Sequence, residues 1–109
     1  MKTMLLLIAI AALVIVPLAS AAQCDVKRFE QATGLRLPGN EAKIAWNQGE
    51  TLTGTITNIA FLTGRGLKGL KKGDAVEATY LGKRSFKFLH VPSGHKLEYV
   101  QVDVADSWD

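Results

Sequence analysis

Apolar and polar residues alternate along most of the chain after residue 41, which is the pattern of half-buried β-strands. The candidate strands are separated by turns rich in glycine, proline and asparagine, and they cover residues 42–46, 51–61, 75–81, 85–91 and 96–104. Five short strands with such turns predict an all-β domain. Because so few strands leave two exposed sheet edges, we expect a small, partly open five-stranded barrel, either SH3-like or OB-like.

The run at residues 51–61 differs from the others because Gly54 lies inside it and its alternation changes near Asn58. A glycine inside a strand often marks a bend or bulge, and one extra residue would explain the change. No helical periodicity is visible between this run and the strand at 75–81. An OB-like barrel normally has a helix at that place, so we prefer the SH3-like arrangement.

A short helix is predicted before the strands, in the segment DVKRFEQATG. Asp25 can act as its N-cap, Val26 and Phe29 share one face, and Gly34 can adopt the left-handed conformation that ends a helix. A helix of about nine residues is not stable alone, so it must pack on the rest of the domain. We therefore expect a short helix and turn at 23–41 and a small β-barrel domain at 42–109.

The first 22 residues have the pattern of a secretory signal peptide. Lys2 precedes an apolar run of twelve residues, 5–16, and small residues follow it. The run is shorter than the ~20 residues that a membrane-spanning helix needs. We expect cleavage near residue 22 and a periplasmic or secreted protein, with an uncleaved N-terminal anchor as the alternative.

Cys24, the only cysteine of the chain, lies directly after the predicted signal. It could carry a lipid, but Gln23 stands before it where the lipoprotein pattern has a small residue. Without a second cysteine it is either free or pairs with another chain through a flexible N-terminus. A membrane partner is expected only if the signal is uncleaved or this cysteine is lipidated.

The segment TGRGLKGLKKGD, residues 63–74, contains the pattern G-x-G-x-x-G followed by two lysines. The dinucleotide fingerprint needs a strand that leads through such a turn into a helix. Here the turn is followed by another strand, and the spacing of a P-loop is absent. We exclude nucleotide binding and expect no cofactor. The plain alternative is a mobile, soluble connection between two strands.

Basic residues are concentrated between Arg65 and Lys87, where seven basic residues accompany two acidic ones. They could converge into one cationic surface made by Arg65, Lys68, Lys71, Lys72, Lys83, Arg84 and Lys87. Such a surface would bind an acidic protein, an anionic glycan or lipid headgroups. We expect no nucleic-acid partner, because residues 23–109 hold 12 basic and 10 acidic residues. Aromatic anchors for the contact could come from Tyr80, Phe88 or Trp46.

Two histidines, His90 and His95, flank the turn VPSG. They would share a metal ion if they lay opposite each other on one face, and would point apart if a bulge lay at Gly94. A metal site needs three or four ligands, and few others are near in sequence, so we expect no metal.

Catalytic chemistry is not indicated, because Ser85, Ser93 and Ser107 do not lie in the strand-turn-helix arrangement that exposes a nucleophilic serine. We expect an exported, non-catalytic domain that binds a partner in the periplasm or cell envelope, for example to inhibit or neutralise another protein. The alternatives are a metal-binding periplasmic protein that uses the two histidines and a membrane-anchored structural protein of the envelope.

Overall fold

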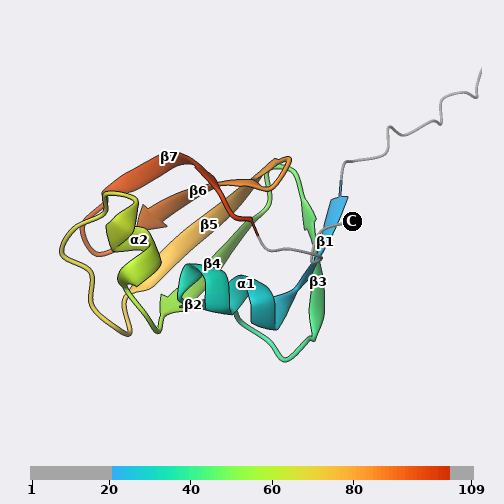
Figure 1. The fold of residues 1–109 in the computed structure, drawn as a ribbon, viewed down its shortest axis with the longest axis horizontal. Helices are drawn as coiled ribbons and strands as arrows, with labels where there is room; N and C mark the ends of the chain where they lie inside the picture. The colour runs from blue at the N-terminus through green and yellow to red at the C-terminus, as the bar shows by residue number, and fades with distance from the viewer. Residues whose placement is uncertain (1–20, 104–109) are drawn as a thin grey trace, which may run out of the picture.

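The computed structural model describes residues 21–103, which form two helices and seven strands. In chain order they are β1 (Ala21–Asp25), α1 (Val26–Thr33), β2 (Leu35–Arg36), β3 (Lys43–Asn47), β4 (Thr51–Ile56), α2 (Ala60–Gly64), β5 (Ala75–Gly82), β6 (Ser85–His90) and β7 (Lys96–Gln101) (Figure 1). Nearly all of the predicted signal peptide lies outside these residues, as does Ser107. Cleavage of the signal therefore stays a prediction.

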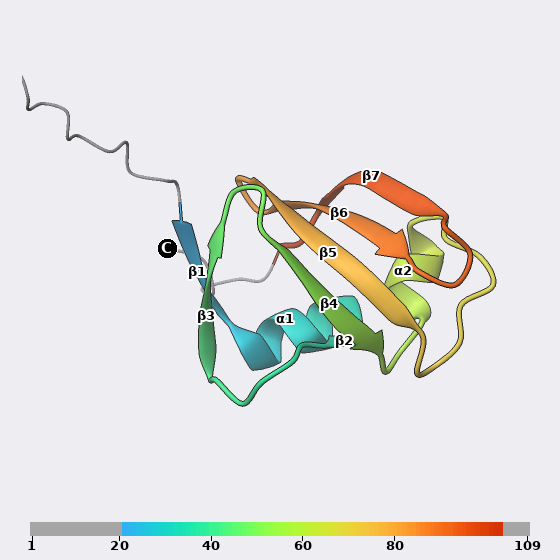
Figure 2. The same cartoon turned by 180° about the vertical axis from the view of Figure 1, so that it is seen from behind.

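The strands form two antiparallel sheets. Five strands are arranged in the order β2-β4-β5-β6-β7, and β1 pairs with β3 in a separate sheet. Figure 2 shows the β1–β3 pair beside the end of the larger sheet where β4 begins. The prediction of a mostly β domain is confirmed. Residues 21–103 form two sheets and no closed barrel. The partly open barrel of SH3-like or OB-like type stays a prediction.

Helix α1 begins and ends at the residues that its sequence indicated. The Asp25 side chain accepts a hydrogen bond from the Arg28 N–H at 3.2 Å, and Gly34 ends the helix with φ of 76°. Phe29 and Thr33 are buried where the helix packs on the sheet. The expectation of a short helix that must pack on the rest of the domain is confirmed.

Helix α2 contradicts two predictions for the segment after β4. The strand expected at 51–61 ends at Ile56, and residues 60–64 are helical. Asn58 starts the change, because its side-chain oxygen accepts a hydrogen bond from the Ala60 N–H at 2.8 Å. The altered alternation therefore marked the end of a strand. Five residues are too few to show a helical period, so the sequence pattern did not indicate this helix.

Gly54 is not the site of a bulge, because β4 pairs with β5 in continuous register from Thr51 to Thr55. A Cβ at this position would lie 3.1 Å from the Arg36 carbonyl oxygen and 3.3 Å from the Leu35 Cβ. The glycine thus lets β2 approach β4 closely.

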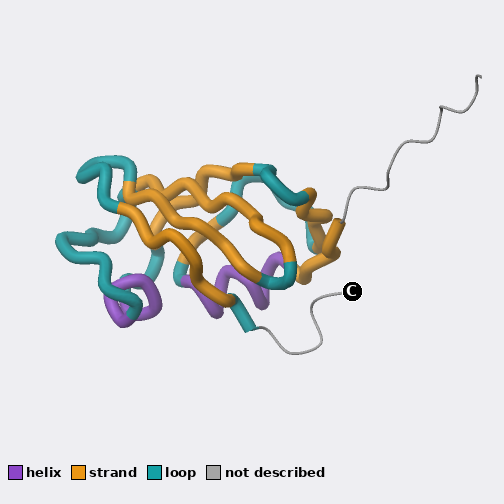
Figure 3. The backbone as a smooth tube through the Cα atoms, turned by 90° about the horizontal axis from the view of Figure 1, so that it is seen from above, coloured by secondary structure: helices purple, strands orange, loops and turns teal. Residues whose placement is uncertain are grey.

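Both helices cover the same face of the five-stranded sheet, as Figure 3 shows. Aromatic rings fill the space between them and the sheet, with Phe29 and Trp46 both in contact with Phe86. Tyr80 and Phe88 belong to the same core, and Trp46, Tyr80 and Phe88 are at most 3% exposed. The suggestion that these three aromatics contact a partner is wrong, because the core already covers them.

β7 contains a bulge that explains its two-sided apolar pattern. Phe88 pairs with Leu97 and Phe86 with Val100, so β7 has one residue more than β6 between these pairs. Leu97 and Val100 therefore both face the core, and Tyr99 is 71% exposed. The sequence places Val100, Val102 and Val104 on one face and Leu97 and Tyr99 on the other, which predicts a strand partly covered on both faces; the outer face is instead exposed at Tyr99.

Cys24 lies inside β1, opposite Ile44 of β3, and is fully buried. Burial, with a smaller contribution from Asp25, raises the pKa of its thiol to about 12. In this structure the thiol is protonated and inaccessible, so the expected flexible N-terminus around Cys24 is wrong. The predicted cleavage point at residue 22 falls within β1, and lipidation of Cys24 would require the loss of residues 21–23 from this strand.

Candidate functional site

Four of the seven predicted binding residues lie together on one segment. The connection between α2 and β5, which we call the cationic loop, spans residues 65–74 and carries the exposed side chains of Arg65, Lys68, Lys71 and Lys72. It joins a helix to a strand, whereas the sequence suggested a connection between two strands. Three of its glycines, at 66, 69 and 73, have positive φ, which explains why glycine occurs there.

The cationic loop is anchored to the domain at several points. Leu67 and Leu70 are buried, and they alternate with the exposed lysines. At the start of the loop, the Arg65 guanidinium carbon lies 4.8 Å from the centre of the Phe61 ring, a cation–π contact. At its end, the Asp74 carboxylate accepts a hydrogen bond from the Lys71 N–H at 3.0 Å. The loop therefore presents its cations from a defined backbone.

The other three predicted residues do not join this group. Lys83 and Arg84 form the turn between β5 and β6, at the far end of β5 from the cationic loop. Eight residues of strand separate the two ends by about 25 Å. Lys87 lies between them on β6, opposite Thr79. The single seven-residue surface expected from the sequence is wrong, because the cationic loop and the β5–β6 turn lie at opposite ends of the same strand.

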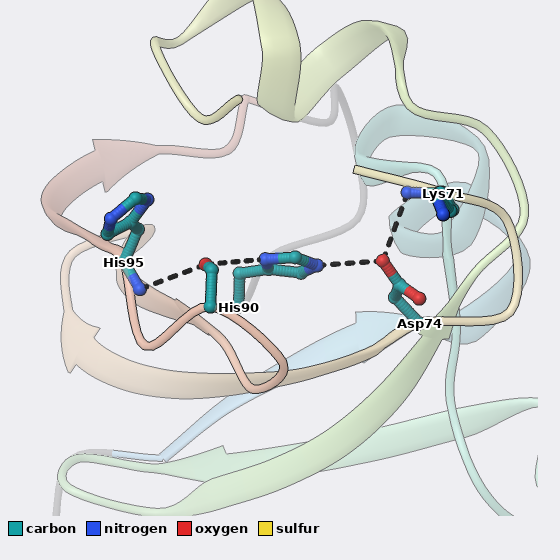
Figure 4. Close-up of polar contacts among 5 residues, drawn as sticks. Lys71, Asp74, His90 and His95 are labelled. Carbon is teal, nitrogen blue, oxygen red and sulfur yellow. Dashed lines mark hydrogen bonds and ion pairs between the residues drawn. The ribbon is translucent and has the colours of Figure 1, made fainter. Parts of the chain in front are cut away.

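A chain of hydrogen bonds joins the end of the cationic loop to the turn between β6 and β7 (Figure 4). The His90 ring is 2% exposed, and its Nε2 lies 2.8 Å from the Asp74 carboxylate. Its Nδ1 lies 2.7 Å from Ser93 Oγ, which also accepts a hydrogen bond from the His95 N–H at 3.1 Å. The cationic loop and the turn are thus held by one buried imidazole.

The donors and acceptors of this chain are matched. A carboxylate only accepts, so Nε2 of His90 carries the proton toward Asp74. In the neutral ring, Nδ1 then accepts the Ser93 hydroxyl proton. The hydrogen bond from His90 holds the pKa of Asp74 below its usual value, the Lys71 N–H adds to this effect, and partial burial opposes it. The Asp74 carboxylate therefore stays ionised to lower pH than an ordinary aspartate does.

The chain Asp74–His90–Ser93 has the same order of groups as a catalytic triad. In many such triads, free backbone N–H groups or polar side chains also stabilise the developing oxyanion. The two N–H groups that follow Ser93 are occupied, since Gly94 donates to the His90 carbonyl and His95 donates to Ser93 Oγ. In this structure the chain of contacts joins the cationic loop to the β6–β7 turn, and no sequence pattern indicated it, because Asp74 is 16 residues from His90.

The histidine pair does not form a metal site in this structure. Both ring nitrogens of His90 are occupied by Asp74 and Ser93, and Figure 4 shows the exposed ring of His95 turned away. Within residues 21–103, no group of three histidine, cysteine or acidic residues is placed to hold a metal ion. The idea that these two imidazoles meet is wrong.

The lowered pKa of Asp74 gives the link a defined pH dependence. Its ionised form stabilises the fold above the unfolded-state pKa, which is about 4 for aspartate, and this contribution is lost as the pH falls through the lower native value. We expect the stability advantage over Asp74→Asn to be present at pH 5 and to shrink below about pH 4. Urea unfolding of both proteins from pH 5 to 2.5 measures this advantage. Histidine in the unfolded chain is already protonated at the upper end of this range.

The matched control for this experiment is Glu41→Gln, which removes an exposed carboxylate from the segment before β3. Its effect on stability should change less over the same pH range. An advantage over Asp74→Asn that stays constant down to pH 2.5 would show that His90 does not hold the Asp74 carboxylate.

Comparison with protein-family models, with curated proteins and with solved structures finds no match for this chain. Among residues 21–103, no helix is long and apolar enough to cross a membrane.

Proposed function

We propose that this protein is an exported, non-catalytic module that binds an anionic partner in the periplasm or cell envelope through its cationic loop. The partner is an acidic protein, an anionic glycan or a lipid headgroup, and inhibition or neutralisation of another protein is one task that suits such a module. A single observation carries the proposal: Arg65, Lys68, Lys71 and Lys72 are exposed together on an anchored loop.

The charge of these four residues is available to a partner. Within residues 21–103, the ion pairs are Arg84 with Asp103 and Lys96 with Glu98, and Asp74 is bonded to His90, so none of these contacts involves the four side chains. Exposed like charges attract an anionic partner over about 8–10 Å at ordinary salt, and added salt screens this attraction. Binding through the cationic loop should therefore weaken as salt is raised.

Anchoring of the loop supports a binding role further. A mobile loop loses conformational entropy when it binds, which lowers the affinity, and a loop held in place before binding loses less. Leu67 and Leu70 hold the middle of this loop, and the link from Asp74 to His90 holds its end. The cost of ordering the loop is thus largely met on folding.

The test is a pull-down from envelope extract at 50 and 300 mM salt, roughly a twofold change in screening length. The bait is the purified protein, whose intact mass also reports whether residues 1–22 have been removed. It is compared with the triple variant Lys68→Gln, Lys71→Gln and Lys72→Gln. We expect a partner that the wild type retains at low salt and that the triple variant loses by about tenfold or more.

A charge-matched control is the triple variant Lys27→Gln, Arg36→Gln and Lys43→Gln. These three exposed cations lie on α1, β2 and β3, away from the cationic loop. The control should keep most of the binding, since only total charge has changed. Equal losses in the two triple variants would contradict a role for the cationic loop, and binding that neither salt nor either variant alters would contradict the proposal altogether.

A further inference from the structure

Among the strands of residues 21–103, β7 is the outermost of the larger sheet and pairs with β6 on one side only. A groove of about 300 Å³ is lined by Arg65 and by residues 97–101 of this strand. The edge of a sheet offers unpaired N–H and C=O groups that an incoming strand can bind. The groove therefore combines a backbone edge with one charged side chain from the cationic loop.

The direction of the backbone groups of β7 follows from its pairing with β6. His90 donates its N–H to the His95 carbonyl at 2.9 Å, and Val102 donates to the Arg84 carbonyl at 2.9 Å. Hydrogen-bonded and non-hydrogen-bonded pairs alternate along an antiparallel ladder. Lys96 and Gln101, which are next to these pairs, thus direct their N–H and C=O groups away from β6, and Gln101 lines one end of the groove.

Arg65 provides the charge of the groove. The cation–π contact with Phe61 holds its guanidinium beside β7, and within residues 21–103 no carboxylate forms an ion pair with it. Glu98 is the acidic residue of the groove, and Lys96 neutralises it at 3.3 Å. A carboxylate is the group that an arginine fork binds best, because it accepts two parallel hydrogen bonds.

We propose that the edge of β7 and Arg65 form a strand-addition site for an extended acidic peptide segment of a partner protein. The inference rests on the proposed function. Of the three partners named there, an acidic protein, an anionic glycan and a lipid headgroup, it selects the acidic protein. The bulge at Glu98 and Tyr99 bends the edge, which disfavours full-length pairing with a second copy of β7. A short segment that follows the bend, with a carboxylate against Arg65, is the occupant.

The geometry also determines which peptide N–H groups bind. Leu97 and Val100 pack on the core, so their neighbours Lys96 and Gln101 face the outer side of the sheet. Arg65 directly follows α2, which covers the inner side. Directly opposed residues of two paired strands point to the same face. Peptide residues whose N–H groups bond to β7 therefore point their side chains to the outer face of the sheet. The alternate peptide residues point their side chains toward Arg65 and their N–H groups away from β7.

The experiment titrates the purified protein with an eight-residue peptide that alternates threonine and glutamate. Glutamate should face Arg65, so threonine N–H groups should bond to β7. Methylation of the four threonine nitrogens should weaken binding at least about tenfold, and methylation of the four glutamate nitrogens much less. Amide shifts in an NMR titration should be largest at Lys96 and Gln101.

Two protein variants complete the test. Arg65→Gln should weaken binding of the unmethylated peptide about tenfold. Arg36→Gln, which removes an exposed arginine from β2 at the opposite edge of the sheet, should have little effect. Both variants are exposed substitutions, so each should fold, and circular dichroism verifies this.

The outcomes separate the two proposals. Equal affinities for the two methylated peptides would overturn strand addition but leave charge binding by the cationic loop intact. Failure of all three peptides to bind, with salt-sensitive binding of heparin or of anionic phospholipid vesicles, would overturn the acidic peptide as partner and support a glycan or a lipid surface. If none of these anionic probes binds, both proposals fail.

Discussion

Replacement of Phe86 by alanine is expected to lower the free energy of unfolding by about 3–5 kcal/mol. The Phe86 ring is fully buried, and its centre lies 5.0 Å from that of Trp46 and 5.2 Å from those of Phe29 and Tyr80. Removal of the ring would leave a cavity at the point where α1, β3 and the larger sheet meet. Small domains are stable by only about 5–15 kcal/mol, so the variant should be close to unfolding at 37 °C.

Urea unfolding followed by tryptophan fluorescence measures this loss, because Trp46 contacts Phe86 directly. The control is Tyr99→Ala, which removes a large aromatic side chain that is 71% exposed on β7. It should change the free energy of unfolding by less than about 1 kcal/mol. A loss below about 1 kcal/mol for Phe86→Ala would contradict the packing of the β1–β3 sheet against the larger one.

Replacement of Gly34 by alanine is also expected to have a large effect and to lower the free energy of unfolding by about 2–5 kcal/mol. Gly34 ends α1 with φ of 76°, where a side chain is strained, and its Cβ would overlap the Asn58 carbonyl oxygen. The overlap cannot relax easily, because Thr57 and Asn58 both donate backbone hydrogen bonds to the Gly34 carbonyl at 2.7 and 3.1 Å.

The loss at Gly34 has two contributions, the strain of a positive φ and the overlap with Asn58, and Gly94→Ala separates them. Gly94 also has φ of 76°, but a Cβ added there would meet no atom of residues 21–103 within 4 Å. The Gly94→Ala substitution should lower the free energy of unfolding by only about 1–2 kcal/mol, the cost of the left-handed backbone conformation. Thermal unfolding of both variants measures the difference, which is the cost of the overlap at Asn58. Equal losses would mean that α1 and the segment after β4 are not packed as closely as described.

Local patterns were sufficient for many elements of the fold. Asp25 and Gly34 marked both ends of α1, because helix caps depend on a few neighbouring residues. The alternation at 75–81 and 85–91 indicated β5 and β6, since half-buried strands repeat every two residues. Four of the seven predicted binding residues share the cationic loop, because they lie within eight consecutive residues of the chain.

Other features depend on contacts between distant residues. The first two residues of β1, Ala21 and Ala22, were assigned to the signal peptide and its other three to the helix-and-turn segment 23–41, and only the pairing with β3 marks all five as a strand. The division of the basic residues between two ends of the sheet follows from the length of β5. The link from Asp74 to Ser93 is also tertiary, since it depends on β5 and β6 lying side by side.

The sequence by itself determined the mostly β class, helix α1, and a cluster of lysines between glycines, because each of these depends on short-range conformational preference and hydrophobic period. Only the tertiary structure decided that the strands form two sheets, that Trp46, Tyr80 and Phe88 are core residues, and that His90 bonds to Asp74. The physical reason is that burial and strand pairing join residues far apart in the chain, and no local pattern records which residues will meet.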